Sequence, residues 1–208
     1  MNVNYGISVA LATLALLTAT VPASADGNTL TNARDATAAF NNQASAQAAG
    51  YDLLTDADGL ACIDMPGQGA MGVHYVKGAL VQAGTIDAAR PQAVVYEVQP
   101  DGQLGLVALE YVVLQAAWDG AHPAPPELFG EKFTLTPAGN RYGLPAFYAL
   151  HAWIWKHNPS GMFSSWNPLV GCGGAPGGNA ATEEDPDMVA AQMQGFNCAM
   201  PMDAARPD

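Results

Sequence analysis

Four segments of the chain have the pattern of β-strands, in which apolar and β-branched residues are separated by turn residues. The first two are Ala70–Val76 and Ala93–Gln99. A Pro-Asp-Gly turn after the second predicts a hairpin into the third segment, Leu106–Leu114. The fourth, Phe147–His157, is rich in aromatic residues and is followed by an Asn-Pro-Ser-Gly turn. Short connections between such strands predict antiparallel pairing.

An Ala-rich segment, Leu30–Tyr51, precedes the strands and carries apolar residues near helical spacing. Gly50 can end this helix. The apolar stripe is thin, which is typical of a helix that lies on the outside of a larger core. We therefore predict a mainly β (α+β) fold, a small antiparallel β-barrel or sandwich with an N-terminal helix packed outside.

The first 25 residues are typical of a signal peptide. Gly6–Val21 is apolar and uncharged, and Ala23-Ser24-Ala25 has the small-x-small pattern that precedes a cleavage site. We expect cleavage between Ala25 and Asp26. The leader contains no Lys or Arg, so an uncleaved membrane anchor is the alternative.

The rest of the chain is predicted to be one globular domain, residues 26–172, and a flexible acidic tail rich in Gly, Pro and Met, residues 173–208. The formal net charge is −12, and only seven residues are Lys or Arg. This balance argues against nucleic acid and anionic membranes as partners, because both are bound through clustered basic residues. We expect a secreted or periplasmic protein with a small-molecule ligand.

Three cysteines occur in a chain that we expect to reach an oxidising compartment, where two of them would pair. Cys62 stands before the first long strand segment, and Cys172 follows the last turn-rich segment. We therefore predict a Cys62–Cys172 disulfide, which leaves Cys198 free or intermolecular.

Each of three strand segments carries one ionisable side chain on a face that is otherwise apolar: His74, Glu110 and His151. A buried carboxylate costs several kcal/mol (roughly) unless it is paired or bound. Two imidazoles and one carboxylate suit a divalent Zn, Mn, Fe or Cu ion with an open coordination position. We predict that these three residues bind such a metal and that Glu110 also has a catalytic role.

Two other interpretations of these residues remain. Without a metal, Glu110 and the histidines could form a hydrogen-bonded acid/base pair that transfers protons. Alternatively, each side chain is a core residue with an ordinary hydrogen bond. The predicted function is metal-assisted chemistry on a small molecule; the alternatives are a non-catalytic small-ligand binding module and a structural envelope protein.

Several weaker candidates exist outside this trio. His122 lies in a Pro-rich loop and could gate a cavity, and we expect His157 to be exposed. Arg141 and Tyr142 could anchor an anionic ligand, although a structural contact of their loop is favoured. Aromatic residues of the loop after His157 are expected to pack on the core, and soft ligands in the tail could bind Cu(I). The aromatic residues of this loop are Phe163 and Trp166. The soft ligands of the tail are Met193, Cys198, Met200 and Met202.

The chain lacks the Gly-x-Ser-x-Gly, phosphate-loop, dinucleotide-binding and His-Glu-x-x-His motifs, which disfavours the common hydrolases and nucleotide enzymes. The stretches "GAMGVHYV", "LVALEYVVL" and "PAGNRYGLPAFYALHAWIWKHNPSGMFSSWNP", with Cys172 after them, resemble an exported bacterial family to which no activity is assigned. The resemblance implies export and no catalytic residues. A thinner resemblance to cupins concerns architecture only, because His74 stands alone where cupins have a His-x-His motif followed by Glu.

Overall fold

The computed structural model describes Met1, residues 29–175 and the backbone of residues 179–181. The predicted cleavage site and the Met/Cys cluster of the tail lie outside these residues. No helix in the described part of the chain is long and apolar enough to cross a membrane.

The main element of the fold is a six-stranded antiparallel sheet with the strand order β1-β4-β5-β6-β10-β9. Its strands are β1 (Asp52–Leu53), β4 (Val73–Val76), β5 (Ala93–Val98), β6 (Leu104–Leu114), β9 (Thr134–Thr136) and β10 (Phe147–Ala152). The predicted mainly β, antiparallel architecture is thus confirmed. Within the described residues the end strands β1 and β9 each pair with one neighbour, so no closed barrel forms there. The barrel or sandwich stays a prediction.

Two smaller sheets flank the main one. A three-stranded sheet contains β2 (Cys62–Met65), β3 (Gly69–Ala70) and β11 (Asn179–Ala181), and β11 runs parallel to β2. The strand β11 lies in the segment for which we expected a tail. The third sheet is a hairpin of β7 (Glu127–Leu128) and β8 (Glu131–Lys132). Short helices follow β4 and β6, namely α3 (Gly78–Ala83) and α4 (Gln115–Asp119).

The predicted N-terminal helix forms three short pieces instead of one. They are α1 (Leu30–Thr37), the 3-10 helix η1 (Ala38–Asn41) and α2 (Gln43–Ala48). Asn42 causes the second break, because its extended backbone and its side chain, which accepts a hydrogen bond from the Ala44 amide, cap the start of α2. Gly50 ends the helical segment as predicted, with φ +88° and an amide that donates to the Gln47 carbonyl.

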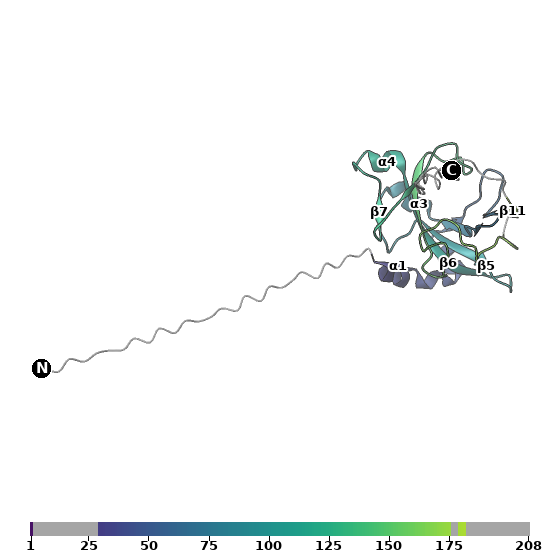
Figure 1. Ribbon diagram of the computed structural model, residues 1–208, viewed down its shortest axis with the longest axis horizontal. Coiled ribbons are helices and arrows are strands. Elements are labelled where there is room, and N and C mark those ends of the chain that lie inside the picture. Colours follow the sequence, from purple (N-terminus) through teal and green to yellow (C-terminus); the bar gives the residue numbers. More distant parts are fainter. Residues whose placement is uncertain (2–28, 176–178, 182–208) are drawn as a thin grey trace, which may run out of the picture.

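The helical segment covers one face of the main sheet, and α1 lies beside β5 and β6 in Figure 1. The Tyr96 hydroxyl on β5 donates to the Phe40 carbonyl of η1 at 2.7 Å. Arg34 on α1 donates to the Ile154 carbonyl at 2.7 Å and lies over the ring of Trp155. The helical segment thus packs against β5 and the chain that follows β10 on one face of the sheet.

The predicted Cys62–Cys172 disulfide is present, with its Cα atoms 5.5 Å apart. It joins β2 to the segment that follows the last strand of the main sheet. Both cysteines are 1% exposed, so the bridge belongs to the core. A disulfide is typical of proteins that mature in an oxidising compartment.

Candidate metal centre

The opposite face of the sheet brings together the three side chains that the sequence singles out. His74 lies on β4, Glu110 on β6 and His151 on β10. Glu110 and His151 are direct cross-strand partners. His74 is separated from Glu110 by β5, where the residue opposite Glu110 is Ala93. Because Ala93 carries only a methyl group, it leaves room for the two longer side chains to meet above it.

The polar atoms of the trio lie at distances that suit a common cation. His74 Nε2 is 3.2 Å from His151 Nε2 and 3.3 Å from Glu110 Oε2. The other ring nitrogen of His151, Nδ1, is 3.4 Å from the other carboxylate oxygen, Glu110 Oε1, and one ligand atom from each of the three residues lies within 4.8 Å of the other two. Ligand atoms that bind a tetrahedral ion at about 2.0–2.1 Å are roughly 3.3 Å from one another. Among the described residues, this trio is the group of His, Cys, Asp and Glu side chains with metal-binding geometry.

Two backbone carbonyls of the turn between β3 and β4 orient the histidines. His74 Nδ1 lies 3.2 Å from the Gly72 carbonyl, to which the neutral ring donates its proton, so that Nε2 is left with a lone pair facing the trio. The backbone of Met71 hydrogen-bonds His151. A second hydrogen bond of this kind is the usual support of a metal-ligating histidine, since it fixes the tautomer and the orientation of the ring.

Gly72 is required at this turn. Its φ is +90°, and a Cβ atom there would lie 2.6 Å from Val95 Cγ1 and 2.8 Å from the Tyr96 carbonyl oxygen. Only glycine adopts this conformation at such close approach without strain. The glycine therefore sets the position of the carbonyl that orients His74.

Burial disfavours charge on each member of the trio. The side chains of His74, Glu110 and His151 are 6%, 12% and 2% exposed. Burial raises the pKa of Glu110 to about 8 and lowers the pKa of His74 to about 4, against the smaller opposing effect of the Gly72 carbonyl. Burial and the neighbouring His74 hold the pKa of His151 well below its ordinary value. At neutral pH the imidazoles are thus already free bases, which is the form that binds a metal.

A cavity of about 760 Å³ opens onto the trio. Glu110 and His151 belong to its lining, whereas His74 does not. The cavity floor is the same sheet face, continued past the trio by apolar side chains. They are Val112, Leu114, Phe147 and Ala149. A group bound by the three residues would therefore face an apolar space on the side of Glu110 and His151.

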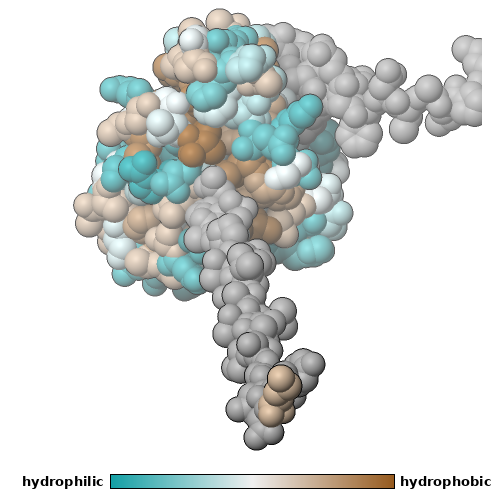
Figure 2. Space-filling model, turned by 90° about the vertical axis from the view of Figure 1, so that its left-hand side faces the viewer, coloured by the Kyte–Doolittle hydropathy of each residue, from teal (hydrophilic) through white to brown (hydrophobic). Residues whose placement is uncertain are grey.

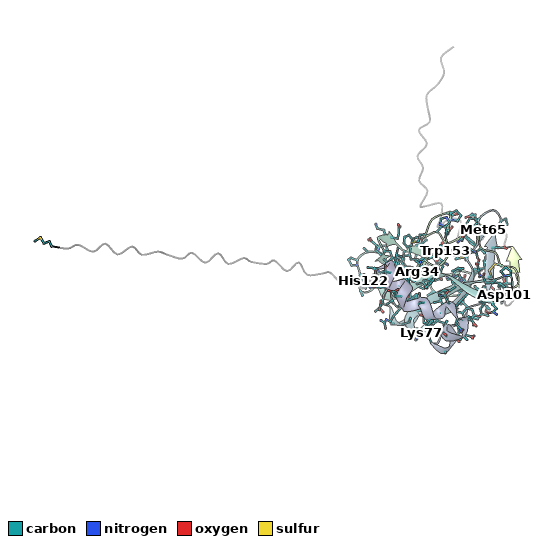
Figure 3. The ribbon with its side chains drawn as sticks, turned by 90° about the horizontal axis from the view of Figure 1, so that it is seen from below. Arg34, Met65, Lys77, Asp101, His122 and Trp153 are labelled. Carbon is teal, nitrogen blue, oxygen red and sulfur yellow. A yellow bond between two sulfur atoms is a disulfide. The ribbon has the colours of Figure 1, made fainter. Side chains whose placement is uncertain are left out.

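The other histidines do not join the site. His157 is exposed, as predicted. His122 is also exposed, and its ring stacks on that of Trp118 with centroids 3.8 Å apart. Figure 3 places His122 at the edge of the domain and away from Trp153, whose ring stacks on that of His151. The structure thus gives His122 a surface contact and no place in the cavity lining.

Arg141 has a structural role that the sequence favoured. Its Nε and Nη2 atoms donate to Asp56 Oδ2 at 3.2 and 2.8 Å, and the Asp56 side chain is 1% exposed. Burial alone would raise the pKa of Asp56, but the Leu60 amide and Arg141 outweigh it and lower that pKa. Arg141 and Tyr142 also line the cavity.

The aromatic residues after His157 combine packing with a place at the cavity. Trp166 is buried with Ile63, Met65 and Met71, and Phe163 stacks on Phe129. Both Trp166 and Phe163 line the cavity as well, whereas their sequence context favoured packing on the core. The soft ligands of the tail, from Met193 to Met202, lie outside the described residues.

Comparison with known proteins identifies no relatives of this chain. The sequence matches no protein-family model, and it has no significant match among curated proteins or solved structures. The resemblance to an exported bacterial family stays a prediction.

Proposed function

We propose that this is an exported protein that binds one divalent metal ion through His74, Glu110 and His151. The ion keeps an open coordination position toward the cavity, where it binds a small oxygen-bearing molecule as a Lewis acid. The observation that carries the proposal is the convergence of two imidazoles and one carboxylate from three strands. His74 Nε2 is 3.2 Å from His151 Nε2 and 3.3 Å from Glu110 Oε2, and one ligand atom from each residue lies within 4.8 Å of the other two.

The surroundings of the trio support this assignment. Because His74 Nδ1 lies against the Gly72 carbonyl, the Nε2 lone pair of His74 faces both His151 and Glu110, where a cation can bind it. Glu110 supplies the charge that partly neutralises a divalent ion in an apolar setting. Three protein ligands are the number that catalytic metal sites use when one position is left for a water or substrate. Zn, Mn, Fe and Cu all accept this donor set.

Glu110 is the residue to which we assign a catalytic role. It lines the cavity and can therefore contact both the ion and a bound molecule. When one carboxylate oxygen of Glu110 binds the ion, the other oxygen is left to accept a hydrogen bond or a proton from the bound molecule. Export is supported by the apolar leader and by the Cys62–Cys172 disulfide.

The test is elemental analysis of the tag-free protein purified from its site of export. We expect about one equivalent of metal in the parent protein and little in His151→Ala. The matched control is His122→Ala, which removes an exposed histidine and should retain the parent content. Circular dichroism establishes that all three proteins are folded. Equal metal in the parent and in His151→Ala would overturn the proposal, as would no binding by the parent after incubation with Zn, Mn, Fe and Cu.

A second candidate function is a metal-free binding module, and the apolar cavity is the observation that favours it. In that case Glu110 would accept or donate a hydrogen bond to the ligand directly. A thermal-shift screen in the presence of a chelator separates the two functions. Ligands that stabilise the protein equally with and without chelator would support the binding module.

A further inference from the structure

The floor of the cavity beside the trio is elongated along β6. Glu110, Val112 and Leu114 are alternate residues of this strand, so their side chains lie in a row on the same face. All three line the cavity. Four residues of a strand span about 13 Å. The floor therefore runs about this distance from the carboxylate of Glu110 along two aliphatic side chains.

The neighbouring strand makes this floor a groove. Ala149 is opposite Val112 and Phe147 is opposite Leu114, and both belong to β10. Ala149 is only partly buried, so its methyl group faces open space, whereas the ring of Phe147 stands at the far end. A ligand that begins at Glu110 and His151 would lie over Val112 and Ala149 and end at Leu114 and Phe147.

The loops contribute both polar side chains, such as Asn140 and Ser160, and apolar side chains to the other walls. Met162 and Leu144 line the cavity, although they are 42% and 39% exposed. Large apolar side chains that remain this exposed at the mouth of a cavity gain stability when a ligand covers them. Figure 2 shows hydrophobic residues gathered near the centre of one face of the molecule and bordered by hydrophilic ones.

Charges on the cavity wall limit the ligand to one negatively charged group. Arg141 is the basic residue among the described lining residues, and two of its donors are engaged by Asp56. Glu131 also lines the cavity and repels anions. A second negative charge on the ligand would therefore meet no unpaired Lys or Arg among the lining residues that the structure describes. At the other end, a divalent ion bound by one carboxylate and two neutral imidazoles keeps one positive charge, which a single anionic head neutralises.

We infer that the ligand of this site is an amphiphile with one carboxylate head and a slender apolar tail, as in a medium-chain monocarboxylic acid. The inference rests on the metal centre proposed above. The head binds the ion at Glu110 and His151, and the tail lies along Val112 and Leu114. A cavity of about 760 Å³ is of the size that encloses ligands of this kind.

Calorimetric titration of the zinc-loaded protein with acetate, hexanoate and decanoate tests the inference. Burial of each additional methylene raises the affinity roughly threefold to fourfold. Decanoate has four more methylenes than hexanoate and should therefore bind about a hundredfold more tightly. Ala149→Leu narrows the groove without touching the trio, and we expect it to remove most of the gain from chain length. The control Ala121→Leu makes the same change at an exposed position outside the cavity and should leave the gain intact.

Zinc content is measured in every sample. This measurement distinguishes failure of the proposed metal centre from failure of the inferred carboxylate ligand. Bound zinc with equal affinities for acetate and decanoate would overturn the inferred ligand and leave the metal centre standing. Bound zinc with a chain-length gain that Ala149→Leu does not reduce would overturn the placement of the tail. If the folded parent binds neither zinc nor any of the acids, both proposals are overturned.

Discussion

His74 Nε2 and His151 Nε2 lie 3.2 Å apart although their strands are separated by two others in the main sheet. In a flat sheet, three strand spacings would hold the two backbones about 14 Å apart, which two imidazole side chains do not bridge. The sheet therefore bends toward the face that carries them. The register of β5 against β6 shifts between Val95 and Tyr96, and a bulge of this kind bends a strand and increases its twist.

Metal binding should release a proton from Glu110. The pKa of this carboxyl is about 8 in the metal-free protein, so at pH 7 it is mostly protonated, whereas both histidines are already neutral. We expect close to one proton released per ion at pH 7 and an affinity that rises about tenfold per pH unit up to about pH 8. Calorimetry in buffers with different heats of ionisation measures this number. Zinc binding without proton release at pH 7 would contradict the prediction.

The stability of the metal-free protein should decrease as Glu110 ionises. Its pKa is raised from 4.5 to about 8, so the folded chain retains a proton that the unfolded chain has lost between these values, and stability falls as the pH rises through this window. Glu110→Gln resembles the protonated form and should not show this fall. Urea unfolding with a chelator present, from pH 4 to pH 9, measures the difference between the two proteins. The histidines affect both proteins in the same direction, because their lowered pKa values make stability rise between about pH 4 and 6.5.

Gly72→Ala should destabilise the fold and weaken the metal site. Alanine at a positive φ costs about 1–3 kcal/mol, and the contacts with Val95 and Tyr96 add about 1–3 kcal/mol more. Gly59→Ala is a matched control, since Gly59 has a φ of +82° and no atom within 4 Å of the added Cβ. Chemical denaturation should show the larger loss for Gly72→Ala. Equal losses in the two variants would mean that the close contacts at Gly72 relax without cost.

Removal of the disulfide should destabilise the protein while leaving the ligands of the metal in place. The bridge joins residues 110 positions apart, and a loop of this length stabilises by roughly 4–5 kcal/mol in the chain-entropy model. We expect the double variant Cys62→Ala, Cys172→Ala to lose about 2–5 kcal/mol, as measured by urea unfolding. Addition of a reductant should lower the stability of the parent and leave that of the double variant unchanged.

Much of the site could be predicted because strand periodicity is a local property. Alternation places His74, Glu110 and His151 on apolar faces of separate strands, and a buried carboxylate needs a partner. The order of the strands is not local, and neither is the bend that brings β4 close to β10. The orienting carbonyls of Met71 and Gly72 carry no side-chain signature, although "AMGVH" places a glycine at the turn before His74.

Tertiary contacts explain the differences from the predicted elements. The strand expected over Phe147–His157 ends at Ala152, since the Trp153 amide donates to the Met162 carbonyl and the chain leaves the sheet. The helix expected over Leu30–Tyr51 breaks where Asn42 caps α2, and the Asn-Asn pair before Gln43 was the available signal. The buried pair of Asp56 and Arg141 joins residues 85 positions apart, so no local pattern predicts it.

The three site residues all lie between the two bridged cysteines in the sequence, and this has a consequence for the fate of a damaged molecule. A protease that cuts any single peptide bond between Cys62 and Cys172 produces two fragments that remain covalently joined. The strands that bear the imidazoles and the carboxylate then stay tethered to one another and can stay paired. Such a nicked molecule would migrate as one species on a non-reducing gel and as two species after reduction.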